Sequence, residues 1–349
     1  MRRTAISDQT IGVVIVNLGT PDDATTPAVR RYLRQFLRDR RIVPMSPLVW
    51  RVILEAFILP TRPRVSAAKY RSIWTANGSP LLVHTLAQAA ALQQRFAASP
   101  DASEVTLGQS TAVRVVAAMR YGQPSLDRVL DQLAASAVER VLIVPMYPQF
   151  STTTVASVYD ALASYMQSRG DQFEYRTVRS WPADPGYIEA CARRIESHWR
   201  QVGRPNLAAG DKVLFSYHGE PVAAVQAGDP YPDECQQTTK LLRQRLGLDE
   251  ASALMTFQSK FGRGQWLTPA TIDTVAALGA AGTKRLDVFC PGFVADCLET
   301  DEEIDQLNQQ AFVNHGGQQF NRVPCLNDSP AWIDALEALV RTHLAGWTT

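Results

Sequence analysis

The hydrophobic residues of this chain recur in short, nearly continuous runs of valine, isoleucine and leucine. The runs lie at residues 12–18, 113–119, 141–146, 213–216, 254–257 and 286–289. Because each run is apolar on both faces, it is typical of a strand that is covered by helices on each side, as in parallel sheets. The pattern predicts a doubly wound α/β fold.

Stretches with helical periodicity separate these runs. We expect a crossing strand within 172–181 and helices at residues 27–37, 80–96, 125–137, 153–167, 186–200, 233–246, 269–278 and 299–312. The segment 181–185 contains two prolines and has the composition of a hinge. We therefore predict two α/β domains, at residues 10–178 and 179–330, and an amphipathic helix at 331–345 that packs back across the first domain.

The most hydrophobic stretch is residues 42–60, which we call the lip segment. Arg51 and Glu55 share one narrow polar stripe of the helix predicted there. These charges and three prolines argue against a transmembrane helix, and we expect the helix to lie between the prolines. The segment is either a buried core helix or an apolar lip that touches a large flat ligand or a membrane surface.

Composition narrows the choice of partners and of compartment. Of 349 residues, 46% are hydrophobic and 20% are charged, as in a soluble globular enzyme. With 35 Lys and Arg against 34 Asp and Glu, no global field attracts nucleic acid. The 5 cysteines form no C-x-x-C pair, so neither a disulfide framework nor a cysteine zinc site is predicted. No apolar signal region follows Arg2 and Arg3, and we expect a cytoplasmic protein.

Candidate chemistry lies at two predicted strand ends. His218 follows the run 213–216, and a row of carboxylates follows the run 286–289, at Asp296, Glu299 and Glu303. Open α/β sheets bind ligands at the carboxyl ends of their strands, and an imidazole can exchange protons near neutral pH or bind a metal. Two interpretations of the carboxylates stay open. They favour a helix N-terminus through the macrodipole, or they form with His218 a site that handles protons or a metal ion.

A series of motifs, in order along the chain, resembles those of the ferrochelatases, which insert Fe²⁺ into a porphyrin in the terminal step of haem synthesis. The motifs are VNLGTP (16–21), NGSP (77–80), MRYG (119–122), PMYPQFSTTT (145–154), FSYHG (215–219), GDPYP (228–232), FQSKFG (257–262) with Trp266, CPGF (290–293) and DCLET (296–300). The resemblance runs from about residue 12 to about residue 338. It implies two similar Rossmann-like domains, each a roughly four-stranded parallel sheet flanked by helices, with a porphyrin cleft between them.

By this resemblance, His218 and Glu299 correspond to the histidine and glutamate that are assigned as the Fe²⁺-binding pair of the family. A porphyrin must lose its two N–H protons as the metal enters, so His218 is expected to accept protons or to bind Fe²⁺, with Glu299 as its partner. Asp296 and Glu303 are expected to form an acidic path for metal or protons. The remaining porphyrin contacts that the resemblance implies are Leu18, Arg120, Tyr121, Tyr147, Ser259, Trp266 and Phe293.

Departures from the family pattern refine these expectations. No cysteine follows Cys325, so we expect no [2Fe–2S] cluster and no permanently bound cofactor, with Fe²⁺ as a substrate. Leu18 stands where relatives that use coproporphyrin often carry tyrosine, which favours protoporphyrin IX. Cys297 stands where some relatives have histidine, which argues against a second histidine in metal delivery. The alternatives are a coproporphyrin III ferrochelatase, a cobaltochelatase and a non-catalytic porphyrin carrier.

Overall fold

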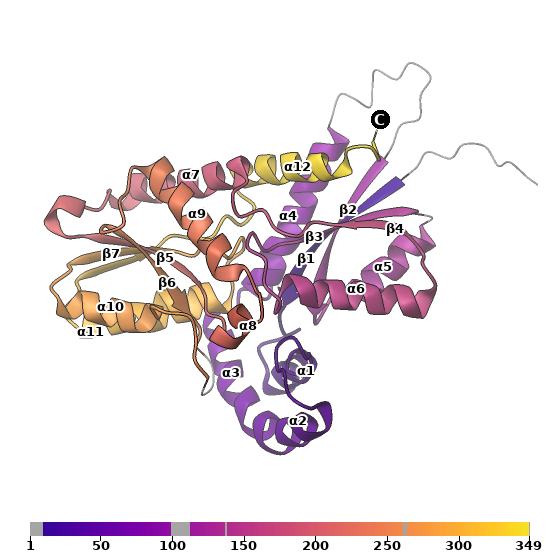
Figure 1. Cartoon of the computed structure of the whole chain (residues 1–349), viewed down its shortest axis with the longest axis horizontal. Helices are drawn as coiled ribbons and strands as arrows, with labels where there is room; N and C mark the ends of the chain where they lie inside the picture. Colours follow the sequence, from indigo (N-terminus) through magenta and orange to yellow (C-terminus); the bar gives the residue numbers. More distant parts are fainter. Residues whose placement is uncertain (1–9, 99–111, 137, 261–263, 349) are drawn as a thin grey trace, which may run out of the picture.

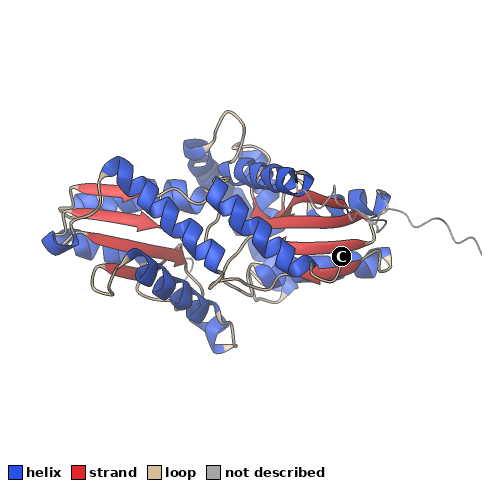
Figure 2. Cartoon of the chain, turned by 90° about the horizontal axis from the view of Figure 1, so that it is seen from above, coloured by secondary structure: helices blue, strands red, loops and turns tan. Residues whose placement is uncertain are grey.

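Two separate four-stranded sheets form the framework of the protein, and the strands within each sheet are parallel (Figure 1). The computed structural model describes residues 10–98, 112–136, 138–260 and 264–348. The sheets have the strand orders β2-β1-β3-β4 and β6-β5-β7-β8, so the second repeats the topology of the first. Helices lie on both sides of each sheet (Figure 2). The predicted fold class, α/β with two Rossmann-like halves, is confirmed.

The first sheet is built around β1, which is flanked by neighbours on both edges. Its strands are β1 (Thr10–Gly19), β2 (Ala112–Tyr121), β3 (Arg140–Pro145) and β4 (Glu174–Thr177). Alternate residues of β1 face opposite sides, because side chains of a strand point up and down in turn. Val13 and Ile15 pack with Leu92 of α4 (Pro80–Ala97), whereas Val14 and Val16 pack under the helices of the other face, α5 (Leu126–Ala135) and α6 (Val155–Arg169).

The second sheet contains a strand that the hydrophobic pattern did not predict. Its strands are β5 (Lys212–His218), β6 (Ala253–Gln258), β7 (Arg285–Phe289) and β8 (Gln319–Arg322). The edge strand β8 has the sequence QFNR, with only Phe320 apolar, so it gave no apolar run. The helices around this sheet include α7 (Pro185–Val202), α9 (Tyr231–Leu246), α10 (Thr271–Ala280) and α11 (Gln309–Asn314), with the short η3 (Leu207–Ala209) and α8 (Val222–Gln226).

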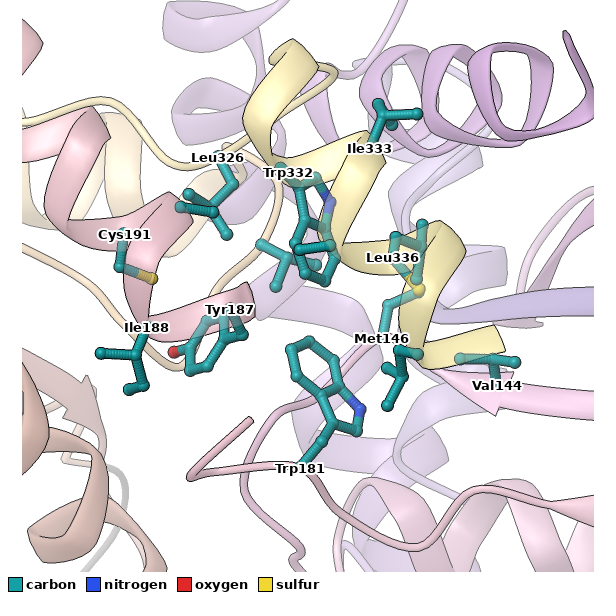
Figure 3. Close-up of a cluster of buried hydrophobic side chains, with 14 of the residues drawn as sticks. Val144, Met146, Trp181, Tyr187, Ile188, Cys191, Leu326, Trp332, Ile333 and Leu336 are labelled. Carbon is teal, nitrogen blue, oxygen red and sulfur yellow. The ribbon is translucent and has the colours of Figure 1, made fainter. Parts of the chain in front are cut away.

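One large hydrophobic core joins the two halves. It includes Trp181, Tyr187 of α7 and Trp332 of α12 (Pro330–Leu344), and the rings of Trp181 and Trp332 stack with centres 5.3 Å apart (Figure 3). The C-terminal helix α12 packs against α4 of the first half and also against α7 of the second. It therefore bridges the halves, and the domain limits of 10–178 and 179–330 stay a prediction. Residue 137, in the helix predicted at 125–137, lies outside the described residues.

The lip segment belongs to a longer helical projection that extends from the two sheets (Figure 1). After α1 (Thr26–Phe36), the chain forms α2 (Pro47–Ile53), a π-helical turn η1 (Leu54–Ile58) and α3 (Leu59–Ile73) without a break. The prediction that the helix ends at Pro60 is wrong, because the π-helical turn η1 leads directly into α3, which continues through Pro60 and Pro63.

Exposure of the lip segment decides between its two interpretations. The exposed fractions of Leu48, Val52 and Phe57 are 80%, 64% and 67%. The interpretation as a buried core helix is therefore wrong for this face, although Leu54 and Leu59 are buried beneath it. No helix in the described part of the chain has the length and apolar character needed to cross a bilayer.

Candidate active site

The predicted histidine lies at the carboxyl end of the central strand of the second sheet. His218 is the last residue of β5, and its Nδ1 lies 2.7 Å from the carbonyl oxygen of Gly219. A carbonyl oxygen can only accept a hydrogen bond, so Nδ1 carries the proton of the neutral imidazole and Nε2 keeps its lone pair. The half-buried ring lies 6.5 Å from the ring of Phe293, centre to centre. His218 can therefore accept a proton, or bind a metal, through Nε2.

Gly219 is required by the close approach of its neighbours. A Cβ on this residue would lie 2.6 Å from the carbonyl oxygen of Gln258, which already accepts a hydrogen bond from the Gly219 N–H. The same Cβ would touch the indole of Trp266 at 3.4 Å, and Trp266 forms an isolated β-bridge with Pro221. Trp266 thus packs against Gly219, the residue after His218, and its role as a porphyrin wall stays a prediction.

Glu299 and Glu303 lie on the helix predicted at 299–312, which is π-helical over its first part, and Asp296 precedes it. This helix, η4 (Glu299–Asn308), follows the loop after β7 and continues into α11. Glu303 accepts hydrogen bonds from both the N–H and the hydroxyl of Ser259. Burial raises the pKa of Glu303, and the charge of Glu299 adds to the rise, whereas the Ser259 bonds and His218 oppose it. His218 and Glu299 therefore both lie within electrostatic range of Glu303.

Glu299 lies in a weakly polar environment made by both halves. Burial raises the pKa values of the Tyr32, Tyr70 and Tyr147 hydroxyls, and the charge of Glu299 adds to each rise. Burial and the same charge raise the pKa of the Cys297 thiol. A thiol with a raised pKa stays protonated at neutral pH, which makes Cys297 a poor metal ligand in this state. Glu299 thus lies within electrostatic range of three phenols and a thiol whose raised pKa values keep them protonated at neutral pH.

Asp296, predicted in the acidic path, has structural partners for both of its oxygens. Oδ1 accepts from Arg322 at 2.7 Å and from the N–H of Cys325 at 3.0 Å, and Oδ2 accepts from Asn327 at 2.7 Å. Although burial opposes it, Arg322 and these hydrogen bonds hold the pKa of Asp296 below its usual range. Arg322 also pairs with Asp301 of η4. Asp296 therefore anchors the start of η4, and its part in an acidic path stays a prediction.

The predicted porphyrin walls come from both halves. Leu18 lies near the end of β1 and Tyr147 follows β3, and both are half-buried. The Tyr147 hydroxyl donates to Asn17 Oδ1 at 3.1 Å, and the Asn17 amide in turn donates to Thr85 of α4. Sequence reasoning missed Asn17, although it lies in the VNLGTP motif. The arrangement fixes the ring of Tyr147 near the carboxyl ends of the first sheet.

Arg120 and Tyr121 are bound to the base of the lip segment. Arg120 Nη2, the Tyr121 hydroxyl and the Ser157 hydroxyl all donate to one oxygen of Asp39, over 2.6–2.7 Å. Arg120 Nε also bonds to Ser157. These bonds hold Arg120 at Asp39 and Ser157, and its contact with a porphyrin propionate stays a prediction. The corresponding role of Ser259, whose hydroxyl holds Glu303, also stays a prediction.

A buried glutamate next to the histidine was missed as a site residue. Glu220 is 3% exposed, and its Oε1 accepts from the hydroxyls of Ser151 and Thr153 in the other half. Its Oε2 is buried and has no hydrogen-bond partner among the described residues. Burial raises the pKa of Glu220 above its usual range. Two features of the sequence could have pointed to Glu220: its position two residues after His218 and the polar run at 151–154.

No group of three or more His, Cys, Asp and Glu side chains within the described ranges is arranged to hold a metal ion. The sequence matches the ferrochelatase family over residues 10–344. Among solved structures, the chain resembles SirB from Bacillus subtilis with Fe³⁺, with a TM-score of 0.53, 10% identity and 97% of each chain covered. It also resembles the sirohydrochlorin chelatase SirB from Bacillus subtilis subspecies spizizenii in complex with cobalt, with a TM-score of 0.49, 9% identity, and 95% and 94% of the chains covered. The first of these likenesses shows a shared fold.

Proposed function

Because the chain belongs to the ferrochelatase family, and so is an enzyme that inserts a metal ion into a tetrapyrrole, we propose that it inserts Fe²⁺ into protoporphyrin IX to give protohaem. The observation that carries the proposal is the position of His218 beside the start of η4. Gln258 is hydrogen-bonded to the main chain at Gly219, next to His218, and at Glu299, and His218 and Glu299 both act on the pKa of Glu303. The groups lie at the carboxyl end of a parallel sheet, and Nε2 of His218 is left available by the bond of Nδ1 to the Gly219 carbonyl. Such a set can attract a divalent cation and accept protons.

The proposed mechanism exchanges two protons for one metal ion. Each pyrrole N–H bond of the porphyrin breaks, the proton leaves, and the nitrogen lone pair that remains bonds to Fe²⁺, so the charge of the product is balanced. His218 accepts a pyrrole proton at Nε2 or holds Fe²⁺ there in transit, and Glu299 is its partner. Glu303, whose pKa is raised by burial, is suited to take a proton onward.

The choice of protoporphyrin IX rests on the apolar side chain of Leu18. Leu18 offers no hydroxyl for a polar porphyrin substituent, and its half-buried side chain suits an apolar vinyl edge. Coproporphyrin III is the second candidate, because its ring and two of its propionates match those of protoporphyrin. A cobaltochelatase and a porphyrin carrier are less well supported, since one histidine and two carboxylates interact in the site.

We also propose that the protein is cytoplasmic and contacts the inner membrane face through its lip segment. The exposed side chains Leu48, Val52 and Phe57 lie on the projection. Residues 30–71, which make up most of that projection, contain eleven Lys or Arg against two Asp or Glu, although the whole chain is nearly neutral. Apolar side chains with surrounding cations are suited to an anionic bilayer surface.

The reaction can be tested by anaerobic incubation with Fe²⁺ and protoporphyrin IX, followed by absorbance. We expect the wild type to metallate the porphyrin, and His218→Ala and Glu299→Gln to lose most of the rate, roughly a hundredfold or more. His343→Ala, in α12, is the matched control and should keep the wild-type rate. Wild-type rates in both site variants would contradict the proposal, and faster turnover of coproporphyrin III or Co²⁺ would change the assigned substrate.

A further inference from the structure

Gln258 contacts the supports of both proposed reactive groups. It is the last residue of β6 and is 2% exposed. Its main-chain carbonyl accepts the N–H of Gly219 at 2.6 Å, and the Gly219 carbonyl holds Nδ1 of His218 at 2.7 Å. Two consecutive hydrogen bonds therefore connect the end of β6 to the tautomer and direction of the imidazole.

The side chain of Gln258 reaches the other group. Its Nε2 donates to the main-chain carbonyl of Glu299 at 2.8 Å, and its Oε1 accepts from the Ser216 hydroxyl at 2.7 Å. The orientation of the amide is fixed, because the Glu299 carbonyl can pair only with the nitrogen. Ser216 is itself fully buried and lies 2.8 Å from the hydroxyl of Thr271, so the amide is supported from behind.

We propose that Gln258 is a positioning residue that sets the distance and direction between His218 and Glu299. The inference rests on the proposed function and deepens it. The two reactive groups lie on separate elements, the end of β5 and the first residue of η4, and Gln258 is hydrogen-bonded to the main chain beside one and to the main chain of the other. Small displacements between reacting groups cost large factors in rate, so a fixed geometry has a direct effect on turnover.

The two attachments can be separated by mutation. Gln258→Met keeps the length of the side chain and the main-chain bond to Gly219, but it removes the bond to the Glu299 carbonyl. We expect kcat for metal insertion to fall about tenfold to a hundredfold. The KM for porphyrin should change less than twofold, because no porphyrin contact is assigned to the amide. Ser216→Ala removes the hydrogen bond from the Ser216 hydroxyl to the Gln258 amide, and it should lower kcat by a smaller factor.

A matched control separates positioning from a general loss of stability. Gln93 of α4 also uses its amide to bind main-chain groups, at Val113 and Val115 of β2, on a strand remote from His218. Gln93→Met should leave kcat unchanged. Hydrogen–deuterium exchange of η4 amides should speed up in Gln258→Met and not in Gln93→Met, which is a readout independent of turnover.

Each outcome decides the inference. Reduced kcat with faster exchange in η4 and an unchanged porphyrin KM supports it. A wild-type kcat in Gln258→Met overturns the inference. If that variant does not fold, a wild-type kcat in Ser216→Ala overturns it. If the wild type does not metallate any porphyrin, the proposed function fails, whereas exchange in η4 still decides whether Gln258 holds that helix.

Discussion

At the scale of single residues, the backbone of Ser259 shows how the site holds a carboxylate. Its φ is +66°, a left-handed conformation that costs a residue with a Cβ about 1 kcal/mol or more. In this conformation the N–H and the hydroxyl both bond to Glu303. The two hydrogen bonds to a charged group offset the conformational cost and keep Glu303 beside Glu299 and His218.

We predict different outcomes for two substitutions of Ser259. Ser259→Ala removes the hydroxyl and keeps the strained backbone, whereas Ser259→Gly removes the hydroxyl and relieves the strain. The glycine variant should therefore be more stable than the alanine variant by about 1 kcal/mol in urea denaturation. An alanine variant as stable as the glycine variant would show that the conformation carries no cost. Both variants should raise the pKa of Glu303 further, since the bonds that lower it are reduced.

The residues that we propose as reactive could be singled out from the sequence, and their supports could not. His218 and Glu299 are found by local motifs at strand ends, and the structure brings both into one site. Gln258 and Glu220 act through partners 39 and more residues away along the chain, such as Gly219 and Ser151. A contact of that kind depends on strand order and register, which a single sequence does not specify.

At the scale of elements, the π-helix η4 concentrates acidic residues around one arginine. Arg322 of β8 pairs with Asp296 and Asp301, and it lies 3.6 Å from Asp305. The edge strand β8 is too polar to be predicted from an apolar run, yet it supplies the cation that holds η4. The helix predicted at 299–312 is confirmed as a helical segment, and its π-helical character over 299–308 is a feature that i, i+4 spacing does not distinguish from an α-helix.

Asp301 gives this element a pH dependence. Burial raises its pKa to about 6, the charge of Asp296 adds to the rise, and Arg322 opposes it. An aspartate in the unfolded chain has a pKa of about 3.9. Between these values the folded state holds a proton that the unfolded state releases, so the contribution to stability is present below about pH 4 and is lost as the pH rises through the folded pKa.

We therefore predict that Asp301→Asn gains stability relative to the wild type as the pH rises. The asparagine cannot ionise, so it does not lose this contribution. The difference in free energy of unfolding between variant and wild type, measured in urea at pH 4.5 and pH 7.5, should shift in favour of the variant at the higher pH. A difference that is constant, or that shifts the other way, would contradict the raised pKa.

At the scale of the whole molecule, polar contacts supplement the shared core between the halves. The loop at 150–153 of the first half is held by acids of the second. Asp229 accepts from the N–H and hydroxyl of Thr152, and Glu234 accepts from the N–H of Phe150, all at 2.7 Å. In the same loop, Ser151 and Thr153 donate to Glu220, two residues after His218. Because the loop follows Tyr147, these contacts align the two sides of the proposed site.

We predict that the halves unfold together and that Asp229 contributes to their joint stability. Asp229→Ala removes the two hydrogen bonds from Thr152 and a third from the N–H of Tyr231, and it should lower the free energy of unfolding by about 2–3 kcal/mol. Denaturation followed by both fluorescence and circular dichroism should give one coincident transition, because the main core includes residues of both halves. Asp233→Ala, at an exposed position of α9, is the control and should cost less than about 1 kcal/mol. Two separate transitions would contradict a shared core.

Membrane contact through the lip segment can be tested by mutation, with exposed apolar residues elsewhere in the molecule as the control. Leu48 and Phe57 are 80% and 67% exposed, and burying such side chains in a bilayer contributes about 1.5–3 kcal/mol each. Co-sedimentation with vesicles rich in phosphatidylglycerol should fall at least tenfold in Leu48→Gln/Phe57→Gln, and 0.5 M salt should weaken binding of the wild type. Leu307→Gln/Val313→Gln, which changes two exposed apolar residues on η4 and α11, should bind as the wild type does.

Equal binding by the lip variant and the wild type, or equal loss in both double variants, would contradict a lip-specific contact. Because neither pair of residues lies among the groups that handle protons or metal, all three proteins should metallate soluble porphyrin at the same rate, so a loss of sedimentation reports on the surface alone.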